Sequence, residues 1–396
     1  MKYGFLFVGA VGVLFVALLA GCDKFEELPN EEAQEEETYN GFITLEEVAQ
    51  LLSTVPLGRE QVAEVQEGST SSAGNGYDDE YRMRDLFSSP GSGVGADPTT
   101  KASSYSRPLR ELLREAAEAR FATKSASGDA SAWLDSLAAS DVQIYWPGAE
   151  EWDGSQLPVI TYDPGDGAER NEGYELLPDG SVKKLMVDEQ MARERPVWVV
   201  NRNSDADYKS LELRRREDPN WGNGGGDILV TKADDGFRTL VLRSFKAHRQ
   251  YDSWFAGGAE ILVKFGAVET VKAGTDAELL QYQANVTDFM IVVRRNQVGQ
   301  ELPFNAVLVS DWSKLKELQL EQCALLMVED DGGTQKTWEF KTTVKYNSKA
   351  YGVEIEMPLN SRDDIIWRGP LTPSFIEKKS GIPVGFGDVE LVLELI

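Results

Sequence analysis

Residues 259–266 read AEILVKFG, and segments of this kind decide the fold expected for the C-terminal half of the chain. The segment is short, rich in β-branched and aromatic residues, and follows the glycine pair Gly257 and Gly258. These properties are typical of a strand. The same pattern recurs between turn-forming residues at 288–296, 305–312, 323–330, 337–347, 351–359 and 389–396. Strands repeated at this spacing predict an antiparallel β-sandwich over residues 245–396.

The region before it, residues 129–244, is also expected to be rich in strands. It opens with a short helix, which we expect around residues 130–140. Residues 173–177 and 181–188 flank a Pro-Asp-Gly turn, and this arrangement predicts a hairpin. Further strands are expected at 142–146, 158–163, 196–201, 210–216, 227–231 and 237–248.

The N-terminal region, residues 43–128, contains two helix signals. Thr44 is a good N-cap, and Glu47 three residues later completes a capping box. An apolar stripe follows, and Pro56 ends this first helix. A second helix is expected over residues 106–124, where leucines recur at helical spacing after a proline in the first turn.

Residues 67–106 separate these two helices and are rich in Gly, Ser and Pro, which predicts a long loop or linker. Within this stretch, YDDEYRMRDLF at 77–87 is too aromatic and apolar for a linker, and we expect a short helix that docks onto the body. The chain is therefore expected to be an α+β protein, mostly β. A helical N-terminal region (43–128) precedes a β-rich middle domain (129–244) and a C-terminal antiparallel β-sandwich (245–396).

The chain begins with an uncharged apolar stretch, residues 5–20, that follows the cation Lys2. At about 16 residues the stretch is shorter than the roughly 20 that a membrane-spanning helix needs, and it ends in small residues as a secretory signal does. The sequence LAGC at residues 19–22 resembles the lipobox of bacterial lipoproteins. The resemblance implies a signal peptide over residues 1–21 and lipid attachment at Cys22. An ordinary signal peptide with a chance cysteine and an uncleaved anchor are the alternatives.

An acidic segment, residues 22–42, follows the lipobox. Between Asp23 and Glu37 there are eight carboxylates and one lysine, so the segment is expected to be a solvated tether. The chain resembles uncharacterised envelope and surface lipoproteins of Bacteroidota through the lipobox, this tether and the segment AHRQYDSWFAGGAE at 247–260. That resemblance implies an outer-membrane lipoprotein, held to the membrane by lipid at Cys22, that faces the periplasm or the cell surface.

The composition excludes several classes of function. A net charge of −26 argues against nucleic acid as a partner, because phosphate binding needs clustered Lys and Arg. The single histidine, His248, excludes multi-histidine metal sites, and we interpret it as structural. Once Cys22 is lipidated, Cys323 has no disulfide partner and is expected to be a small buried residue. The sequence therefore favours a non-enzymatic protein, although chemistry that uses carboxylates alone stays open.

Five loop aspartates are candidate metal ligands. Asp252 precedes a glycine pair and a strand, Asp330 and Asp331 follow another strand, and Asp363 and Asp364 follow a third. This arrangement resembles C2-type sandwiches, in which loop aspartates at one end of the sandwich gather calcium. The resemblance implies calcium as a cofactor, since this ion takes six to eight oxygen ligands. Solvated loop acids in an acidic protein are the alternative.

The sequence contains two further patterns that could mark a binding site. Residues 201–212 match the ligand spacing of an EF-hand loop, but Ala206 replaces the sharp-turn glycine and a strand precedes the loop, so we favour a polar turn. Several tryptophans lie beside turn-forming residues and could offer aromatic faces to a sugar or peptide, with core packing as the alternative. They are Trp146, Trp152, Trp221, Trp254, Trp312 and Trp367.

The sequence as a whole predicts a lipid-anchored protein of the cell envelope whose β-sandwich binds an envelope or extracellular ligand or partner, with calcium assisting. The alternative is an exported carboxylate-dependent hydrolase that acts on a glycan or peptide, with acids such as Asp252 or Asp364 and loop tryptophans as substrate platforms. A pair of partly buried acids in one aromatic cleft would favour the hydrolase, whereas acids clustered only at a solvent-facing rim would favour the binding protein.

Overall fold

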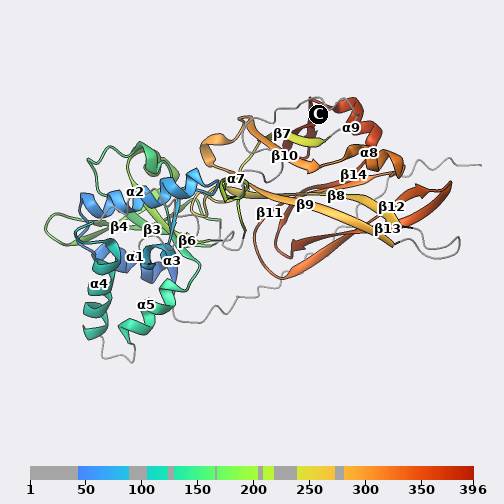
Figure 1. Ribbon diagram of the computed structural model, residues 1–396. Coiled ribbons are helices and arrows are strands. Elements are labelled where there is room, and N and C mark those ends of the chain that lie inside the picture. The colour runs from blue at the N-terminus through green and yellow to red at the C-terminus, as the bar shows by residue number, and fades with distance from the viewer. Residues whose placement is uncertain are drawn as a thin grey trace, which may run out of the picture. The chain divides into compact units, whose positions relative to one another are not determined.

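A computed structural model of the chain describes residues 43–88, 105–123, 129–165, 167–203, 208–217, 239–272 and 281–396 (Figure 1). All of these residues belong to one compact unit, residues 42–396. The predicted signal peptide, the acidic tether and Cys22 lie outside the described residues. Among the described helices, none has both the length and the apolar character needed to cross a membrane.

The helices of the N-terminal region and the first sheet form one lobe, described within residues 43–203, which we call the helix–sheet lobe. Its six-stranded sheet has the order β1-β2-β6-β3-β4-β5, and its strands pair antiparallel except for the parallel pair β3 and β6. The strands are β1 (Glu80–Arg82), β2 (Val142–Tyr145), β3 (Val159–Tyr162), β4 (Arg170–Leu176), β5 (Val182–Asp188) and β6 (Val197–Arg202). The helical segments are α1 (Leu45–Thr54), α2 (Arg59–Gly74), α3 (Met83–Phe87), α4 (Leu109–Thr123), α5 (Ala130–Ala138), η1 (Ala149–Glu151) and α6 (Glu189–Glu194).

Helix α1 shows why the predicted helices form. The Thr44 side chain accepts a hydrogen bond from the backbone N–H of Glu47 at 3.2 Å, which confirms the predicted N-cap. Val48, Leu51 and Leu52 are buried and join one apolar core with residues of the sheet. Figure 1 shows α1 beside the sheet, where it packs across β3, β4 and β6. The predicted helices around 106–124 and 130–140, and the hairpin of β4 and β5, are confirmed as well.

Two local predictions are wrong. The segment 67–74, expected in a loop, continues helix α2 to Gly74, because Val65 and Ser69 are fully buried on the face of the helix that packs against β1. The segment 210–216, expected to be a strand, forms helix α7 (Leu211–Glu217). Ser210 Oγ accepts from the N–H of Leu213 at 3.0 Å and begins that helix.

Two predictions need qualification. The segment 77–87, expected as one short helix, divides into strand β1 and helix α3. The strand expected at 227–231 lies outside the described residues.

The predicted β-sandwich forms the second lobe, described within residues 239–396, which we call the sandwich lobe. Two four-stranded antiparallel sheets, β10-β7-β16-β15 and β14-β11-β8-β9, share one apolar core, and the long hairpin β12-β13 packs against the second sheet. Figure 1 shows these strands in yellow to red. They are β7 (Leu240–Ala247), β8 (Ala259–Lys272), β9 (Gln281–Val293), β10 (Leu302–Val309), β11 (Cys323–Glu329), β12 (Gln335–Tyr346), β13 (Lys349–Asn360), β14 (Asp364–Leu371), β15 (Ile382–Phe386) and β16 (Val389–Leu395), with η3 (Arg295–Gln297), α8 (Trp312–Glu317) and α9 (Pro373–Lys379).

The loop between β7 and β8 joins the two lobes. The N–H of Gly258 donates to Asp78 Oδ2 at 2.7 Å, and the Asn201 side chain donates to the carbonyl of Phe255 at 3.0 Å. Trp254 and Phe255 from this loop are buried in an apolar cluster with strands of the helix–sheet lobe. The loop that carries Asp252 is therefore anchored to both lobes.

Cys323 lies as its sequence context suggested, whereas His248, interpreted as structural, has an exposed side chain. Cys323 is fully buried in β11, and burial raises the pKa of its thiol to about 12, so it remains a protonated core residue. His248 is exposed just after β7, where its backbone N–H donates to the carbonyl of Asp388 at 2.9 Å.

Candidate metal centre

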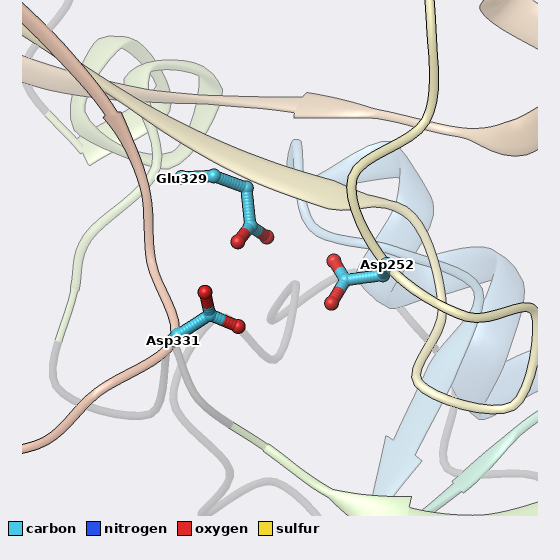
Figure 2. A group of neighbouring side chains, drawn as sticks. All are labelled: Asp252, Glu329 and Asp331. Atoms are coloured by element: carbon cyan, nitrogen blue, oxygen red, sulfur yellow. The ribbon is translucent and has the colours of Figure 1, made fainter. Parts of the chain in front are cut away.

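Three carboxylates from two segments of the sandwich lobe converge at one point (Figure 2). Glu329 is the last residue of β11, and Asp331 follows it in the turn before β12. Asp252 lies in the loop between β7 and β8. Figure 2 shows the three side chains turned toward one another, and we call this group the carboxylate triad.

The β-ladder fixes the position of Glu329. Strand β11, CALLMVE, lies between β8 and β14 and is buried throughout. Glu329 pairs with Ile261 of β8 and with Asp364 of β14. The N–H of Asp330 then donates to the carbonyl of Glu260 at 3.0 Å, which extends the ladder past the strand end. Glu329 is thus held by main-chain bonds on both sides.

The turn that presents Asp331 depends on two glycines. Gly332 and Gly333 have φ values of 69° and 99°, a region that residues with a side chain rarely adopt. Asp330 Oδ1 accepts from the N–H of Gly332 at 3.1 Å and stabilises the reversal. On the other side of the triad, Arg295 Nη1 donates to the carbonyl of Asp252 at 3.2 Å and fixes that loop.

The triad has the spacing that a bound cation needs. One oxygen from each residue lies within 4.8 Å of the oxygens of the other two. Two oxygens that each coordinate calcium at about 2.3–2.6 Å are at most about 5 Å apart, so the three can share one ion. Glu329 is 1% exposed, Asp252 is partly buried and Asp331 is exposed, so the site opens to solvent on one side.

Two buried oxygens of the triad have no hydrogen-bond partner among the described residues. They are Glu329 Oε1 and Asp252 Oδ2. A buried acceptor without a partner costs free energy, so such an atom calls for a proton, a water or an ion. Both belong to the one group of acids that meets at the end of β11.

The electrostatics of the triad disfavour three separate negative charges. Burial, together with the negative charges of Asp252 and Asp331, raises the pKa of Glu329 to about 11. Burial raises the pKa of Asp252 to about 6, and the pKa of Asp331 is also raised, mainly by burial. The group must therefore hold protons or a cation at neutral pH, and a divalent cation would displace the protons.

The chemistry of the donors fits a hard cation. The triad offers only carboxylate oxygens, which suit calcium, magnesium or manganese better than zinc. Three carboxylates supply three to six oxygens, depending on whether each binds through one oxygen or two. The remaining positions on the ion are left to water or to a ligand on the exposed side, next to Asp331.

The other predicted ligands have different places. Asp330 binds Gly332 and the Asn360 side chain, and Asp363 Oδ2 accepts from the N–H of Asn360 at 2.7 Å. Burial raises the pKa of Asp363 to about 6. Asp364 is exposed at the start of β14, and its charge contributes to the raised pKa of Asp331.

The structure thus brings Asp252 and Asp331 together with Glu329, which sequence reasoning did not include. The available signal was an acid as the last residue of the otherwise apolar strand CALLMVE. The segment 201–212, which has EF-hand ligand spacing, is described only in part, because residues 204–207 lie outside the described residues. Asn201 belongs to β6, and Glu212 belongs to helix α7.

Most of the tryptophans singled out in the sequence are packed in cores. Trp146, Trp254 and Trp312 are at most 4% exposed, and Trp367 is partly buried against Phe386. Trp221 lies outside the described residues. Trp146, Trp152 and Trp254 nevertheless line one cavity of about 670 Å³, which lies near the triad because Arg295 both lines it and holds Asp252.

Comparison of the chain with protein-family models, with curated proteins and with solved structures finds no match. The fold and the site define an α+β protein, mostly β, in which three carboxylates converge at one end of a β-sandwich strand.

Proposed function

We propose that this chain is a lipid-anchored protein of the cell envelope whose β-sandwich binds a ligand or partner, assisted by a calcium ion on Asp252, Glu329 and Asp331. The observation that supports the cation is the convergence of three carboxylates within 4.8 Å, one of them fully buried with an unpartnered oxygen. Among hard cations, calcium is best suited to three carboxylates that are open to water on one side.

The thermal stability of the full chain tests this proposal. A cation that binds the folded state stabilises it by about 1.4 kcal/mol at ten times its Kd, so millimolar calcium should raise the melting temperature relative to EDTA. Asp331→Asn should reduce that rise, whereas Asp135→Asn, an exposed acid on α5, should not. A melting temperature that is the same in calcium and EDTA would disprove the calcium site.

The proposed location rests on the sequence. The LAGC motif at 19–22 and the acidic segment after it support an outer-membrane lipoprotein that faces the periplasm or the cell surface, attached through Cys22. Cys22→Ser should release the protein from the membrane fraction of cells that express it. Retention of that variant in membranes would contradict lipid attachment.

A carboxylate-dependent hydrolase is a second candidate, because two acids that line the cavity have pKa values shifted in opposite directions. Burial and the neighbouring Asp78 raise the pKa of Asp79 to about 7. Bonds to Arg193 and Arg295 lower the pKa of Glu189, although its partial burial opposes them. One protonated and one ionised carboxyl beside aromatic walls is the pattern of acid–base glycosidase sites. New reducing ends released from oligosaccharides by the wild type but not by Asp79→Asn would favour the hydrolase over a binding protein.

A further inference from the structure

The cavity of about 670 Å³ is formed by residues of both lobes, and none of the triad residues lines it. The helix–sheet lobe contributes the end of β2 and residues 192–196 after the start of α6, and the sandwich lobe contributes Trp254 and residues 294–296. Its volume lies within the roughly 300–1,000 Å³ of small-ligand sites. It is therefore large enough for a ligand of a few rings.

Two atoms of residues that line this cavity are buried and lack a hydrogen-bond partner within the described part of the chain. One is an acceptor, Oδ1 of Asp79. This residue is 5% exposed. The nearest cation atom, Arg294 Nη1, lies 3.7 Å away, beyond hydrogen-bond distance. The other is a donor, Nε of Arg195. A ligand that both donates and accepts would satisfy the two atoms together.

The charges around the cavity do not favour an anionic ligand. The four arginines that line it face three carboxylates, because Glu189 faces two of them, and the lining contains more acids than arginines, so it carries no surplus positive charge. The pairs are Arg193–Glu189, Arg195–Glu175, Arg294–Asp79 and Arg295–Glu189. Glu151 and Glu194 also line the cavity and are exposed, which adds negative charge at its edge. A phosphate or carboxylate ligand would be repelled there, and a neutral polar ligand would not.

Trp152 supplies a fixed aromatic surface. The side chain is partly buried, its Nε1 donates to the carbonyl of Gln156 at 2.9 Å, and its ring packs edge-on against Trp146 with 5.8 Å between centroids. The ring orientation is therefore fixed before any ligand binds. An aromatic face of this kind contacts the apolar C–H face of a sugar ring while polar groups bind its hydroxyls.

From these observations we infer that the cavity binds a neutral saccharide, with its C–H face on Trp152 and its hydroxyls on Asp79 and Arg195. Hydroxyl groups both donate and accept, as the two unpartnered atoms require. The inference rests on the proposed ligand-binding function, for which it names the ligand class. Calcium does not contact the saccharide in this inference, since none of the triad residues lines the cavity.

The test is calorimetric titration of the full chain with neutral trisaccharides, in a detergent without a sugar headgroup. Maltotriose, cellotriose and N,N′,N″-triacetylchitotriose serve as probes, with trigalacturonate as an anionic probe and trialanine as a peptide probe. We expect at least one neutral trisaccharide to bind. Trp152→Ala and Asp79→Asn should each weaken that binding by about tenfold or more, while Trp152→Phe should retain most of it.

Matched variants outside the cavity serve as controls. Trp338→Ala removes a partly buried tryptophan on β12, and Glu64→Gln changes a buried acid whose carboxylate accepts from the N–H of Leu109 at 2.7 Å. Both should bind as the wild type does. The inference is overturned if no neutral trisaccharide binds at millimolar concentration, if trigalacturonate or trialanine binds more tightly, or if Trp152→Ala has no effect. The melting experiments with calcium separate this failure from failure of the cation site.

Discussion

Glu329 ends a strand in which every side chain is buried, and its own carboxyl is 1% exposed. An acid in such a position is costly unless its charge is compensated. Asp252 and Asp331 add negative charge beside it and cannot compensate it. A cation would turn this unfavourable group into a binding site, which is why Glu329 distinguishes the calcium proposal from a cluster of solvated acids.

Replacing Glu329 tests this reasoning. Glu329→Gln keeps the size of the side chain and is neutral at every pH. Because the pKa of Glu329 is raised by burial, the folded state must hold this carboxyl protonated at neutral pH although the unfolded chain ionises it, and the variant removes that cost, so the unfolding free energy in EDTA should rise by about 1–3 kcal/mol. In millimolar calcium the same variant should lose the stabilisation that the ion gives the wild type. Thermal melting in both buffers measures the two effects. A variant that is less stable than the wild type in EDTA and still responds to calcium would contradict the proposal.

Asp79 predicts a dependence of stability on pH. Burial and Asp78 raise its pKa from the ordinary 3.8 to about 7, so the folded state binds more protons than the unfolded chain between these values. The contribution of Asp79 to the unfolding free energy is fully present below about pH 4. It falls by at most about 4 kcal/mol as the pH rises to about 7. Asp79→Asn should flatten the pH profile of the unfolding free energy in urea, and Glu339→Gln, on an exposed residue of β12, should leave it unchanged. An unaltered profile in Asp79→Asn would show that this carboxyl is not buried as described.

The individual site residues differ in how far the sequence could predict them. Asp331 directly precedes a glycine pair, and Asp252 lies five residues before another, so their positions in loops at strand ends followed from turn chemistry. Glu329 reads as the end of a core strand, and its role depends on a loop 77 positions earlier in the chain, which periodicity cannot place. Asp79 was hidden inside a segment interpreted as a docking helix.

Among the elements, helix α2 contains Gly68, for which the sequence composition predicts the wrong structure. The sequence predicts that Gly68 lies in a linker, but a Cβ at this position would lie 2.4 Å from Cδ2 of Tyr81 on β1. The glycine therefore permits close packing of the helix on the strand. Gly74, at the end of the same helix, has open space around its Cα.

This contrast gives a paired prediction. Gly68→Ala should destabilise the protein by about 1–3 kcal/mol although alanine favours helices, because the methyl group must displace the Tyr81 ring. Gly74→Ala should be neutral or stabilise by up to about 1 kcal/mol. Urea denaturation of the two variants measures the difference. Equal stability of the two variants would mean that α2 does not pack on β1 as described.

The elements that the sequence predicted well are those in which local signals and tertiary packing agree. Helix α1 has its cap at Thr44 and an apolar stripe that meets the sheet, and the hairpin of β4 and β5 has its turn residues between two alternating runs. The alternation of Leu211 and Leu213 predicts a strand, but the segment forms helix α7, which the cap at Ser210 stabilises. The pairing of β1 with β2 links segments more than 60 positions apart, and short-range patterns carry no information on it.

For the whole molecule, the triad and the cavity are connected through one arginine. Arg295 lines the cavity, bonds the carbonyls of Asp252 and Gly257, and pairs with Glu189 of α6. Calcium on the triad would order the Asp252 loop and with it this arginine. The two sites should therefore influence each other.

We expect neutral trisaccharides to bind about fivefold more tightly in calcium than in EDTA, and calcium to bind more tightly in the presence of the sugar by the same factor. Calorimetric titration in both buffers measures the change. Glu329→Gln should remove the difference without altering the cavity. Equal saccharide affinity in calcium and EDTA would show that the two sites act independently.

The most direct measurement is calorimetric titration of calcium into the metal-free full chain, with Glu329→Gln as the matched variant. We predict saturable binding in the wild type, and loss of that binding in the variant. Absence of calcium binding in the wild type at millimolar concentration, or equal binding in the variant, would contradict the assignment of Asp252, Glu329 and Asp331 as a calcium site.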